Sequence, residues 1–521
     1  MKNLALERIQ KMKPYKPPLD GRSEYGGMLL DFNERTKPPQ NRIVSALEKF
    51  VRSQKIQVYP EYFDLGKKIA DYAGVKADQV MITNGSDQGI DIIFRTFTEK
   101  GDKVIIPSPS FAMFYQCAQI GGNEIVCPLY KKDDLSFPLE EVLSLIDEKT
   151  KLIVVCNPNN PTGTAISVAD IEKIAQKAKK AVIYVDEAYF EFSKITAVSL
   201  IKKYSNIIVT RTFSKAFGLA SLRIGYVIAR YKYIAEMLKI RGPYDVNMAA
   251  YYAAYTALED RKSMKRYVED VMGKAKPLVE KFFSENAIPY FFSRSNFILF
   301  RPDNPENTMK LLTNGGALVR PQNKQNIENT LRVSIGTTKQ MKKFIEIYKT
   351  VVLKDLKRKY TFLDRDGTLI FEPQDTYQID SLKNLKILDG VVAGLQELKK
   401  RGYALIMISN QDGLGTSLFP QKSFAAPQEK MLKIFRNNGI TFDQIFICSH
   451  LPQKSCNCRK PKTGLVDKFL RNSNIDKTAS FVCGDRNSDR QFAKNIGIKF
   501  VPMKTNGNFY EAIKSLLTKT I

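Results

Sequence analysis

The sequence contains a single histidine, His450, among its 521 residues. Mechanisms that need a histidine base are therefore impossible elsewhere in the chain, which excludes Ser-His-Asp and Cys-His catalysis. No apolar run reaches the ~20 residues of a membrane helix, and the first residues lack the apolar core of a signal peptide. We therefore expect a cytoplasmic protein with no membrane partner.

Acidic residues are also scarce relative to basic ones, 54 against 81, so the net charge is +27. The lysines are scattered and accompany no nucleic-acid-binding motif, which favours small anionic substrates over a nucleic-acid partner. Seven cysteines in a long chain of this kind do not indicate a disulfide framework. The apolar content of 43% is enough for real cores, and the length predicts more than one domain.

The most informative stretch runs from Ile207 to Tyr226, where an apolar strand leads into Ser214 and Lys215 and, eight residues later, Arg223. A lysine in this position can form a Schiff base with an aldehyde cofactor, while the hydroxyl and the arginine hold the cofactor's phosphate. An isolated Ser-Lys pair would more often be a solvated turn. This pair is accompanied by two other strand ends that carry suitable groups.

One of these strand ends carries Asp186 and, three residues later, Tyr189. A carboxylate can keep a pyridine nitrogen protonated, and a tyrosine hydroxyl can hydrogen-bond the ring's phenolic oxygen. The other ends in a loop, residues 157–163, that contains Asn160. In this order, the three strand ends resemble the fold type I pyridoxal-phosphate aminotransferases, and among them most closely the histidinol-phosphate aminotransferases.

This resemblance covers residues 25–350 and implies an α/β fold with a large mixed-sheet domain, a small α/β domain and a homodimer. It implies pyridoxal 5'-phosphate as cofactor and Lys215 as the catalytic residue, with Arg320 and Arg332 binding substrate. Tyr59 would reach the partner's cofactor phosphate, and Phe111 stands where the family usually has a tyrosine. The implied cofactor-binding residues are Tyr59, Gly85, Ser86, Asp87, Phe111, Asn160, Asp186, Tyr189, Ser214, Lys215 and Arg223.

A basic segment without glycine or proline, residues 349–360, predicts a short tether, and we place the domain boundary between residues 355 and 356. Immediately afterwards an apolar strand ends in Asp364-Arg365-Asp366-Gly367-Thr368. One carboxylate of such a pair can attack phosphorus while the other gives and takes the leaving group's proton. A backbone carbonyl between them can face a metal ion.

Three later motifs accompany this pair, and together they resemble the haloacid dehalogenase phosphatases, which have a Rossmann-like fold. Ser409 and Asn410 would hydrogen-bond the phosphoryl oxygens, and the run from Arg459 to Lys462 would offer cations, with Lys460 matching the family position. Asp485 would complete a Mg²⁺ site. The resemblance therefore implies Asp364 and Asp366 as catalytic, Ser409, Asn410 and Lys460 as substrate-binding, and Asp364, Asp366 and Asp485 as Mg²⁺ ligands.

Three cysteines surround the single histidine, and together these residues, Cys448, His450, Cys456 and Cys458, have the composition of a closed tetrahedral zinc site. A chance cluster of buried thiols is the alternative. Within the dehalogenase superfamily, a zinc loop of this kind occurs in histidinol-phosphate phosphatases and heptose-bisphosphate phosphatases. The run from Ser409 to Thr416 resembles the former.

Both halves thus point to L-histidinol phosphate, as product of residues 1–355 and substrate of residues 356–521. We expect a bifunctional histidine-biosynthesis enzyme that acts on imidazole acetol phosphate, glutamate and histidinol phosphate with pyridoxal phosphate, Mg²⁺ and Zn²⁺. Two alternatives stay open. One is an aminotransferase for another amino acid fused to a heptose-bisphosphate-like phosphatase, and the other is a basic binding protein with vestigial sites. A phosphothreonine decarboxylase also shares much of the first pattern.

Overall fold

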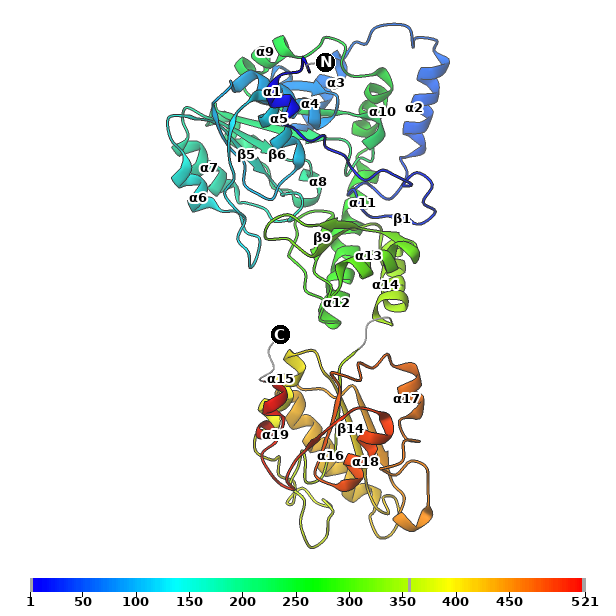
Figure 1. Cartoon of the computed structure of the whole chain (residues 1–521). Coiled ribbons are helices and arrows are strands. Elements are labelled where there is room, and N and C mark those ends of the chain that lie inside the picture. Colours follow the sequence, from blue (N-terminus) through cyan, green and yellow to red (C-terminus); the bar gives the residue numbers. More distant parts are fainter. Residues whose placement is uncertain (1–2, 355–357, 518–521) are drawn as a thin grey trace. The chain divides into compact units, whose positions relative to one another are not determined.

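The computed structural model describes residues 3–354 and 358–517, and the chain forms two compact units, Met1–Val352 and Leu353–Ile521. Figure 1 shows the elements of both units. The predicted boundary between residues 355 and 356 lies outside the described residues. Among the described helices, none has the length and apolar character needed to cross a membrane.

The first unit is built around a seven-stranded mixed sheet with the strand order β2-β8-β7-β6-β5-β3-β4. Only β8 runs antiparallel to its neighbours. The strands read as continuous apolar runs because helices cover both faces of the sheet. Their bounds are β2 (Val80–Thr83), β3 (Lys103–Ile105), β4 (Glu124–Val126), β5 (Thr150–Cys156), β6 (Val182–Asp186), β7 (Ile207–Thr212) and β8 (Gly225–Ile228).

Helices of this large subdomain include α2 (Asn41–Arg52), α3 (Phe63–Ala73), α4 (Gly85–Phe97), α5 (Ala112–Gly121), α6 (Leu139–Leu145), α7 (Val168–Lys177), α8 (Phe190–Ser193), α9 (Tyr231–Ile240) and α10 (Met248–Glu259). The core on one face of the sheet joins buried residues of α4 and α5 to alternate strand residues such as Leu152, Val154 and Tyr184. The strand ends that carry the predicted polar residues therefore meet along one edge of a rigid sheet.

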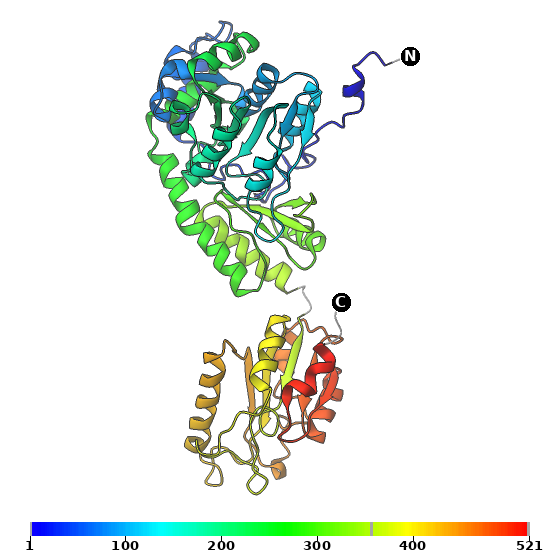
Figure 2. The same cartoon turned by 90° about the vertical axis from the view of Figure 1, so that its left-hand side faces the viewer.

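A smaller subdomain follows, in which the antiparallel strands β11 (Arg320–Gln322), β12 (Thr330–Ser334) and β9 (Phe297–Phe300) form a sheet. The short strands β1 (Met28–Leu29) and β10 (Ala317–Leu318) pair beside it. A long helix, α11 (Lys262–Asp270), continues through a π turn into α12 (Lys276–Glu285), as Figure 2 shows in green. The helices α13 (Pro305–Asn314) and α14 (Thr338–Ile347) complete this subdomain, so the predicted large mixed-sheet domain and small α/β domain are confirmed.

The second unit contains a five-stranded parallel sheet with the order β15-β14-β13-β16-β17. Its strands are β13 (Tyr360–Leu363), β14 (Ala404–Asn410), β15 (Gln444–Cys448), β16 (Phe481–Gly484) and β17 (Lys499–Pro502). The strand order reverses between β13 and β16, and ligands of open parallel sheets bind outside the carboxyl ends of strands at such a point. Asp364 and Asp485 directly follow these two strands.

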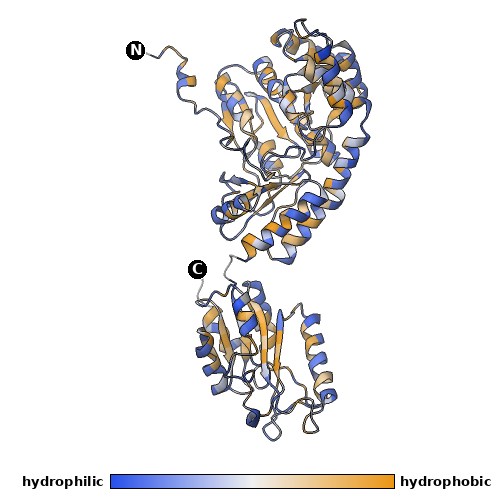
Figure 3. Cartoon of the chain, turned by 90° about the vertical axis from the view of Figure 1, so that its right-hand side faces the viewer, coloured by the Kyte–Doolittle hydropathy of each residue, from blue (hydrophilic) through white to orange (hydrophobic). Residues whose placement is uncertain are grey.

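Helices cover both faces of this sheet, so neighbouring residues of one strand enter different cores. Leu363 packs with α15 (Val391–Lys400), α16 (Gln421–Asn437) and α19 (Phe509–Leu517), whereas Phe362 packs with α17 (Asp467–Asn472) and α18 (Asn487–Ile496). In Figure 3 the strands of this unit are orange, while its helices alternate between orange and blue. The apolar strands thus hold the strand-end loops in fixed positions.

Candidate active sites and the cysteine-rich loop

Lys215 lies in the loop that follows β7, and its side chain is partly buried. Its Nζ donates a 2.8 Å hydrogen bond to the carbonyl of Phe32 and lies 5.9 Å from the centre of the Tyr189 ring. Burial, supported by the charge of Arg332, lowers the pKa of Lys215 to about 8. Roughly a quarter of such amines are neutral at pH 7.5, against about one in a thousand for an ordinary lysine. The amine is therefore suited to attack an aldehyde.

Asp186 ends β6 beside this loop and is 3% exposed. Its carboxylate accepts hydrogen bonds from the Ala188 N–H at 2.9 Å and from the Tyr184 hydroxyl at 3.2 Å. Burial raises the pKa of Asp186 to about 6. A pyridinium placed against this carboxylate would stabilise its ionised form.

The start of α4 forms a cradle with Arg223. Arg223 Nη2 forms a 2.7 Å ion pair with Asp87, and a side chain at Gly85 would bring its Cβ to 2.5 Å from this guanidinium. Gly85 also has a φ of +72°. Since a helix N-terminus and an arginine both favour anions, the cradle fits the phosphate of pyridoxal phosphate. Ser214, also predicted to bind the cofactor, is buried two residues after β7 ends, and its N–H donates to the Thr212 hydroxyl.

Arg332 and Arg320, both on strands of the small subdomain, have buried donors without a partner among the described residues. Arg332 Nη1 donates to Asn160, and Nη2 donates to the Asp31 carbonyl at 2.5 Å. Its Nε and the Nη1 of Arg320 are the buried unpaired atoms. Burial lowers the pKa of Arg332 to about 10. An unpaired buried donor costs about 1–3 kcal/mol, so both guanidiniums are suited to anionic substrate groups.

Two predicted residues of this site pack against other aromatic rings. Phe111 caps the start of α5 and packs edge-on against Phe114 at 5.8 Å. Tyr59 is 74% exposed and stacks on Tyr244 at 4.2 Å. The stacking of Phe111 on the cofactor and the contact of Tyr59 with the partner's cofactor phosphate stay predictions.

Asn33 was missing from the predicted site residues. It is 1% exposed and donates from Nδ2 to the Tyr189 hydroxyl at 3.0 Å, while Ser334 donates to its Oδ1 at 3.1 Å. Its φ of +56° is unusual for a residue other than glycine. Asn33 thereby orients Tyr189, and the Asn-Glu pair after an apolar run was the available signal.

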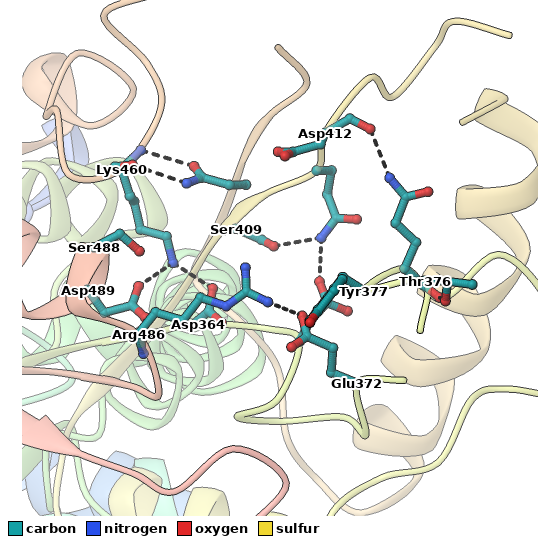
Figure 4. A pocket seen from close by; sticks show the side chains of 14 residues that line it. Asp364, Glu372, Thr376, Tyr377, Ser409, Asp412, Lys460, Arg486, Ser488 and Asp489 are labelled. Atoms are coloured by element: carbon teal, nitrogen blue, oxygen red, sulfur yellow. Dashed lines mark hydrogen bonds and ion pairs between the residues drawn. The ribbon is translucent and has the colours of Figure 1, made fainter. Parts of the chain in front are cut away.

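In the second unit, the predicted residues Asp364, Asp366, Ser409, Asn410 and Lys460 line one cavity of about 220 Å³. Figure 4 shows Lys460 pointing between Asp364 and Asp489. Its Nζ lies 2.5 Å from Asp364 Oδ1 and 2.6 Å from Asp489 Oδ1. Burial opposes the charge of Lys460, but the two carboxylates outweigh burial and raise its pKa. A buried cation of this kind can neutralise a phosphoryl group.

Three carboxylates, those of Asp364, Asp485 and Asp489, converge within 4.8 Å and could hold a metal ion. Asp485 Oδ1 is buried without a partner in the described structure, and burial with crowding by the other two carboxylates raises the pKa of Asp364 to about 8 despite Lys460. Oxygen donors with surplus negative charge fit Mg²⁺. Asp489 was missed as a member of this group, although its spacing of four residues from Asp485 was visible.

The carboxylate of Asp366, also predicted as a Mg²⁺ ligand, lies outside this three-carboxylate group. Its Oδ2 accepts a 2.5 Å hydrogen bond from Gln411, which also donates to Ser409 at 2.8 Å. This arrangement leaves the Asp366 side chain available for proton transfer at the cavity.

Of the cationic run from Arg459 to Lys462, only Lys460 is among the described residues that line the cavity. Arg459 forms an ion pair with Asp412 and donates to the His450 carbonyl, and Lys462 donates to the Cys456 carbonyl at 3.0 Å. These two side chains brace the loops around the cavity rather than entering it. The local sequence could not reveal this, because the partner Asp412 comes from a distant loop.

The ligand atoms of Cys448, His450, Cys456 and Cys458 lie within 4.8 Å of one another. The Sγ of Cys448 is 3.7 Å from that of Cys456 and 3.3 Å from that of Cys458, and His450 Nδ1 is 3.1 Å from the latter. Zn–S bonds of about 2.3 Å place tetrahedral sulfurs roughly 3.8 Å apart, so the donors fit a four-coordinate zinc ion.

The fold of the first unit and the site around Lys215 indicate the class of this chain. Residues 26–347 match the model of the aminotransferase class I and II family, and the chain belongs to that family. Residues 359–505 match the model described as polynucleotide kinase 3 phosphatase, so the second unit is similar to a phosphatase family.

Curated relatives of the first unit include the histidinol-phosphate aminotransferase of Ruminiclostridium cellulolyticum, 33% identical over 60% of this chain and 88% of the relative. The corresponding protein of Methanocaldococcus jannaschii is 31% identical over 68% and 98%. A solved histidinol-phosphate aminotransferase from Clostridium acetobutylicum has 25% identity and a TM-score of 0.57 over 62% of this chain and 99% of the other. The Sinorhizobium meliloti enzyme in complex with pyridoxal-5'-phosphate, at 21% identity and a TM-score of 0.61 over 68% and 99%, shares the fold.

Proposed function

We propose that the chain is a bifunctional enzyme of histidine biosynthesis. Its first unit would transfer the amino group of glutamate to imidazole acetol phosphate, and its second would hydrolyse the resulting L-histidinol phosphate. One observation carries the proposal. A single chain combines a unit whose relatives are named histidinol-phosphate aminotransferases with a second unit whose cavity is lined by Asp364 and Lys460. The first product is itself a phosphate monoester.

In the first unit, pyridoxal phosphate would supply the electron sink for amino transfer. Lys215 would hold its aldehyde carbon and then move a proton between substrate and cofactor carbons. Asp186 would keep the ring nitrogen protonated, and Arg223 with the start of α4 would anchor the phosphate. Arg332 would bind the glutamate carboxylate, because its fixed fork of donors matches that group.

The exposed tyrosine pair supports a homodimer. Tyr59 and Tyr244 lie among further exposed apolar side chains, of which Val51, Ile56 and Val58 are 56–66% exposed. We place the partner subunit on this surface, with Tyr59 directed to its cofactor phosphate.

A cytoplasmic location suits the thiols of the cysteine-rich loop, because they would bind zinc in their reduced form.

In the second unit, Asp364 would attack phosphorus, and the P–O bond to the alcohol would break as Asp366 protonates the departing oxygen. Asp366 would then take a proton from the water that cleaves the aspartyl phosphate. Lys460, Ser409 and Asn410 would bind the phosphoryl oxygens. Mg²⁺, held by Asp364, Asp485 and Asp489, would supply charge stabilisation when bound.

The proposal is tested by giving pure protein imidazole acetol phosphate and glutamate and following 2-oxoglutarate and free phosphate. We expect both to appear, with phosphate lagging behind 2-oxoglutarate. Histidinol phosphate, heptose bisphosphate and an oligonucleotide 3'-phosphate are then compared as phosphatase substrates, the last because of the family match of residues 359–505. Faster turnover of either competitor would replace histidinol phosphate in the proposal.

The zinc loop gives a separate prediction. A closed four-ligand site leaves no place for a reacting water, so the metal would shape the loop that precedes Lys460. His450→Ala should lower zinc content and phosphatase activity together, because losing a ligand exposes unpaired thiolates and loosens the loop. Metal analysis and phosphate release on the same samples measure both. Full activity without zinc would contradict a structural role, and transamination by the same chain serves as the control.

A further inference from the structure

Arg365, between the two catalytic aspartates, turns away from the cavity. Its side chain is 0% exposed, and it is absent from the described residues that line the cavity. Its Nη1 donates to Asp366 Oδ1 at 2.5 Å and its Nε donates to Gln428 at 2.9 Å. The guanidinium also lies 4.9 Å from the centre of the Phe424 ring. Arg365 therefore connects the Asp366 carboxylate to α16.

A purely structural role explains this arrangement poorly. Arg365 Nη2 is buried without a partner in the described structure, and a buried arginine with one carboxylate partner is costly to desolvate. An apolar side chain packed against Phe424 would fill the same volume at a lower cost. The arginine is thus better accounted for by what it does to Asp366.

The two oxygens of Asp366 have different surroundings. Oδ1 faces the buried guanidinium, whereas Oδ2 faces Gln411, which lines the cavity. Arg365 and Gln411 both donate to the carboxylate, so each holds its oxygen in place and neither accepts a proton from it. The ion pair buries Oδ1 against the guanidinium and leaves Oδ2 as the oxygen at the wall of the cavity.

We propose that Arg365 is a positioning residue that aims the Asp366 carboxyl so that its Oδ2 proton reaches the leaving oxygen. This inference rests on the proposed phosphatase reaction. In the first step Asp364 forms a bond to phosphorus, the P–O electron pair goes to the leaving oxygen, and Oδ2 gives that oxygen its proton. In the second step water bonds to phosphorus, its proton goes to Oδ2, and the bond from Asp364 to phosphorus breaks.

The dependence of the cleavage rate on the leaving group distinguishes a role of Arg365 in orienting the Asp366 carboxyl from a role in stabilising the fold. An alkoxide needs the proton, whereas p-nitrophenolate departs without it. In Arg365→Met, single-turnover cleavage of histidinol phosphate should slow about 100-fold, the lower end of a general-acid contribution, while the first-step burst of p-nitrophenolate keeps its rate. Arg365→Lys, which retains a donor-only cation, should recover part of the loss.

Gln428→Leu provides a second test if Arg365→Met folds poorly, because it removes the acceptor that holds the guanidinium and leaves Arg365 in place. It should show a smaller loss with the same selectivity for the alkyl substrate. Arg401→Met, which removes a surface ion pair with Glu397, is the matched control. Transamination by each sample normalises the concentration of chain, and the amplitude of the p-nitrophenolate burst reports the fraction with a folded second unit.

Equal losses for alkyl and aryl substrates in both variants would overturn the proposal. Any alkyl phosphate that the protein hydrolyses can replace histidinol phosphate, so a wrong substrate assignment does not disturb the comparison. Failure of the phosphatase reaction itself would be distinct, since the unmodified protein would then turn over neither substrate.

Discussion

Lys215→Ala is expected to lose transamination by about 10³-fold or more, the scale of a positioned proton-transfer group, while hydrolysis of added histidinol phosphate continues at its full rate. We expect this loss because the variant removes the amine of Lys215. Its hydrogen bond to the Phe32 carbonyl and its lowered pKa of about 8 both place a reactive amine in the first site. The second site is built from residues of the other unit.

Two further variants make this experiment specific. Lys215→Arg keeps the positive charge but stays protonated, so it should be as inactive as the alanine variant. Lys202→Ala changes an exposed lysine of the same unit and should leave both activities unchanged. The measurements are 2-oxoglutarate formation and phosphate release on the same samples. Transamination by Lys215→Ala at the normal rate would refute the assignment.

Much of each site could be predicted because its residues directly follow apolar strands. Asp186 ends β6, and Lys215 and Asp364 come just after β7 and β13. The ends of parallel strands meet at one edge of a sheet, so a local pattern in the sequence predicts a group of neighbours in space. The mixed sheet and the clustering of Cys448 with His450 follow from such local signals.

The residues that escaped prediction act through partners far away in the chain. Asn33 orients Tyr189 and contacts Ser334, which lies 301 residues away in sequence. Arg459 has a cation's usual signature beside Lys460, yet it pairs with Asp412, which lines the cavity, and is not itself among the described lining residues. The family position singled out Lys460, but composition alone does not show which of two adjacent cations faces the cavity.

Asp364 was predicted from its local motif, but its contacts come from residues far away in the chain. Its proposed role as nucleophile rests on the strand-end motif, but its surroundings depend on Lys460 and Asp489, 96 and 125 residues further along the chain. The ion pair between Lys460 and Asp364 holds one carboxylate oxygen in place. Substitution of this aspartate therefore tests both the chemistry of the second unit and the dependence of the first unit on it.

Asp364→Asn should reduce phosphate release by about 10³-fold or more, because an amide cannot attack phosphorus and a single catalytic group contributes on this scale. Asp380→Asn, an exposed position in the same unit, is the matched control. Normal phosphate release by Asp364→Asn would show that another group attacks, and the mechanism of the second unit would have to be rebuilt.

The same variant should change the first reaction indirectly. Transamination is close to balanced, whereas hydrolysis of a phosphate ester is effectively irreversible, so removal of histidinol phosphate pulls amino transfer forward. In Asp364→Asn, histidinol phosphate and 2-oxoglutarate should rise to the transamination equilibrium and stop. Adding the Lys215→Ala chain, which supplies only the phosphatase site, should restore net formation of 2-oxoglutarate.

This mixture also separates mass action from any advantage of the covalent tether, since a tether raises the local concentration of the intermediate only if it lets the two sites approach. We expect the two complementary variants to match the flux of the unmodified chain at equal numbers of active sites. A persistent shortfall that an excess of Lys215→Ala chain removes would instead show that the intermediate passes preferentially between sites of one chain. The comparison uses full-length chains throughout, so differences in folding of the units do not enter it.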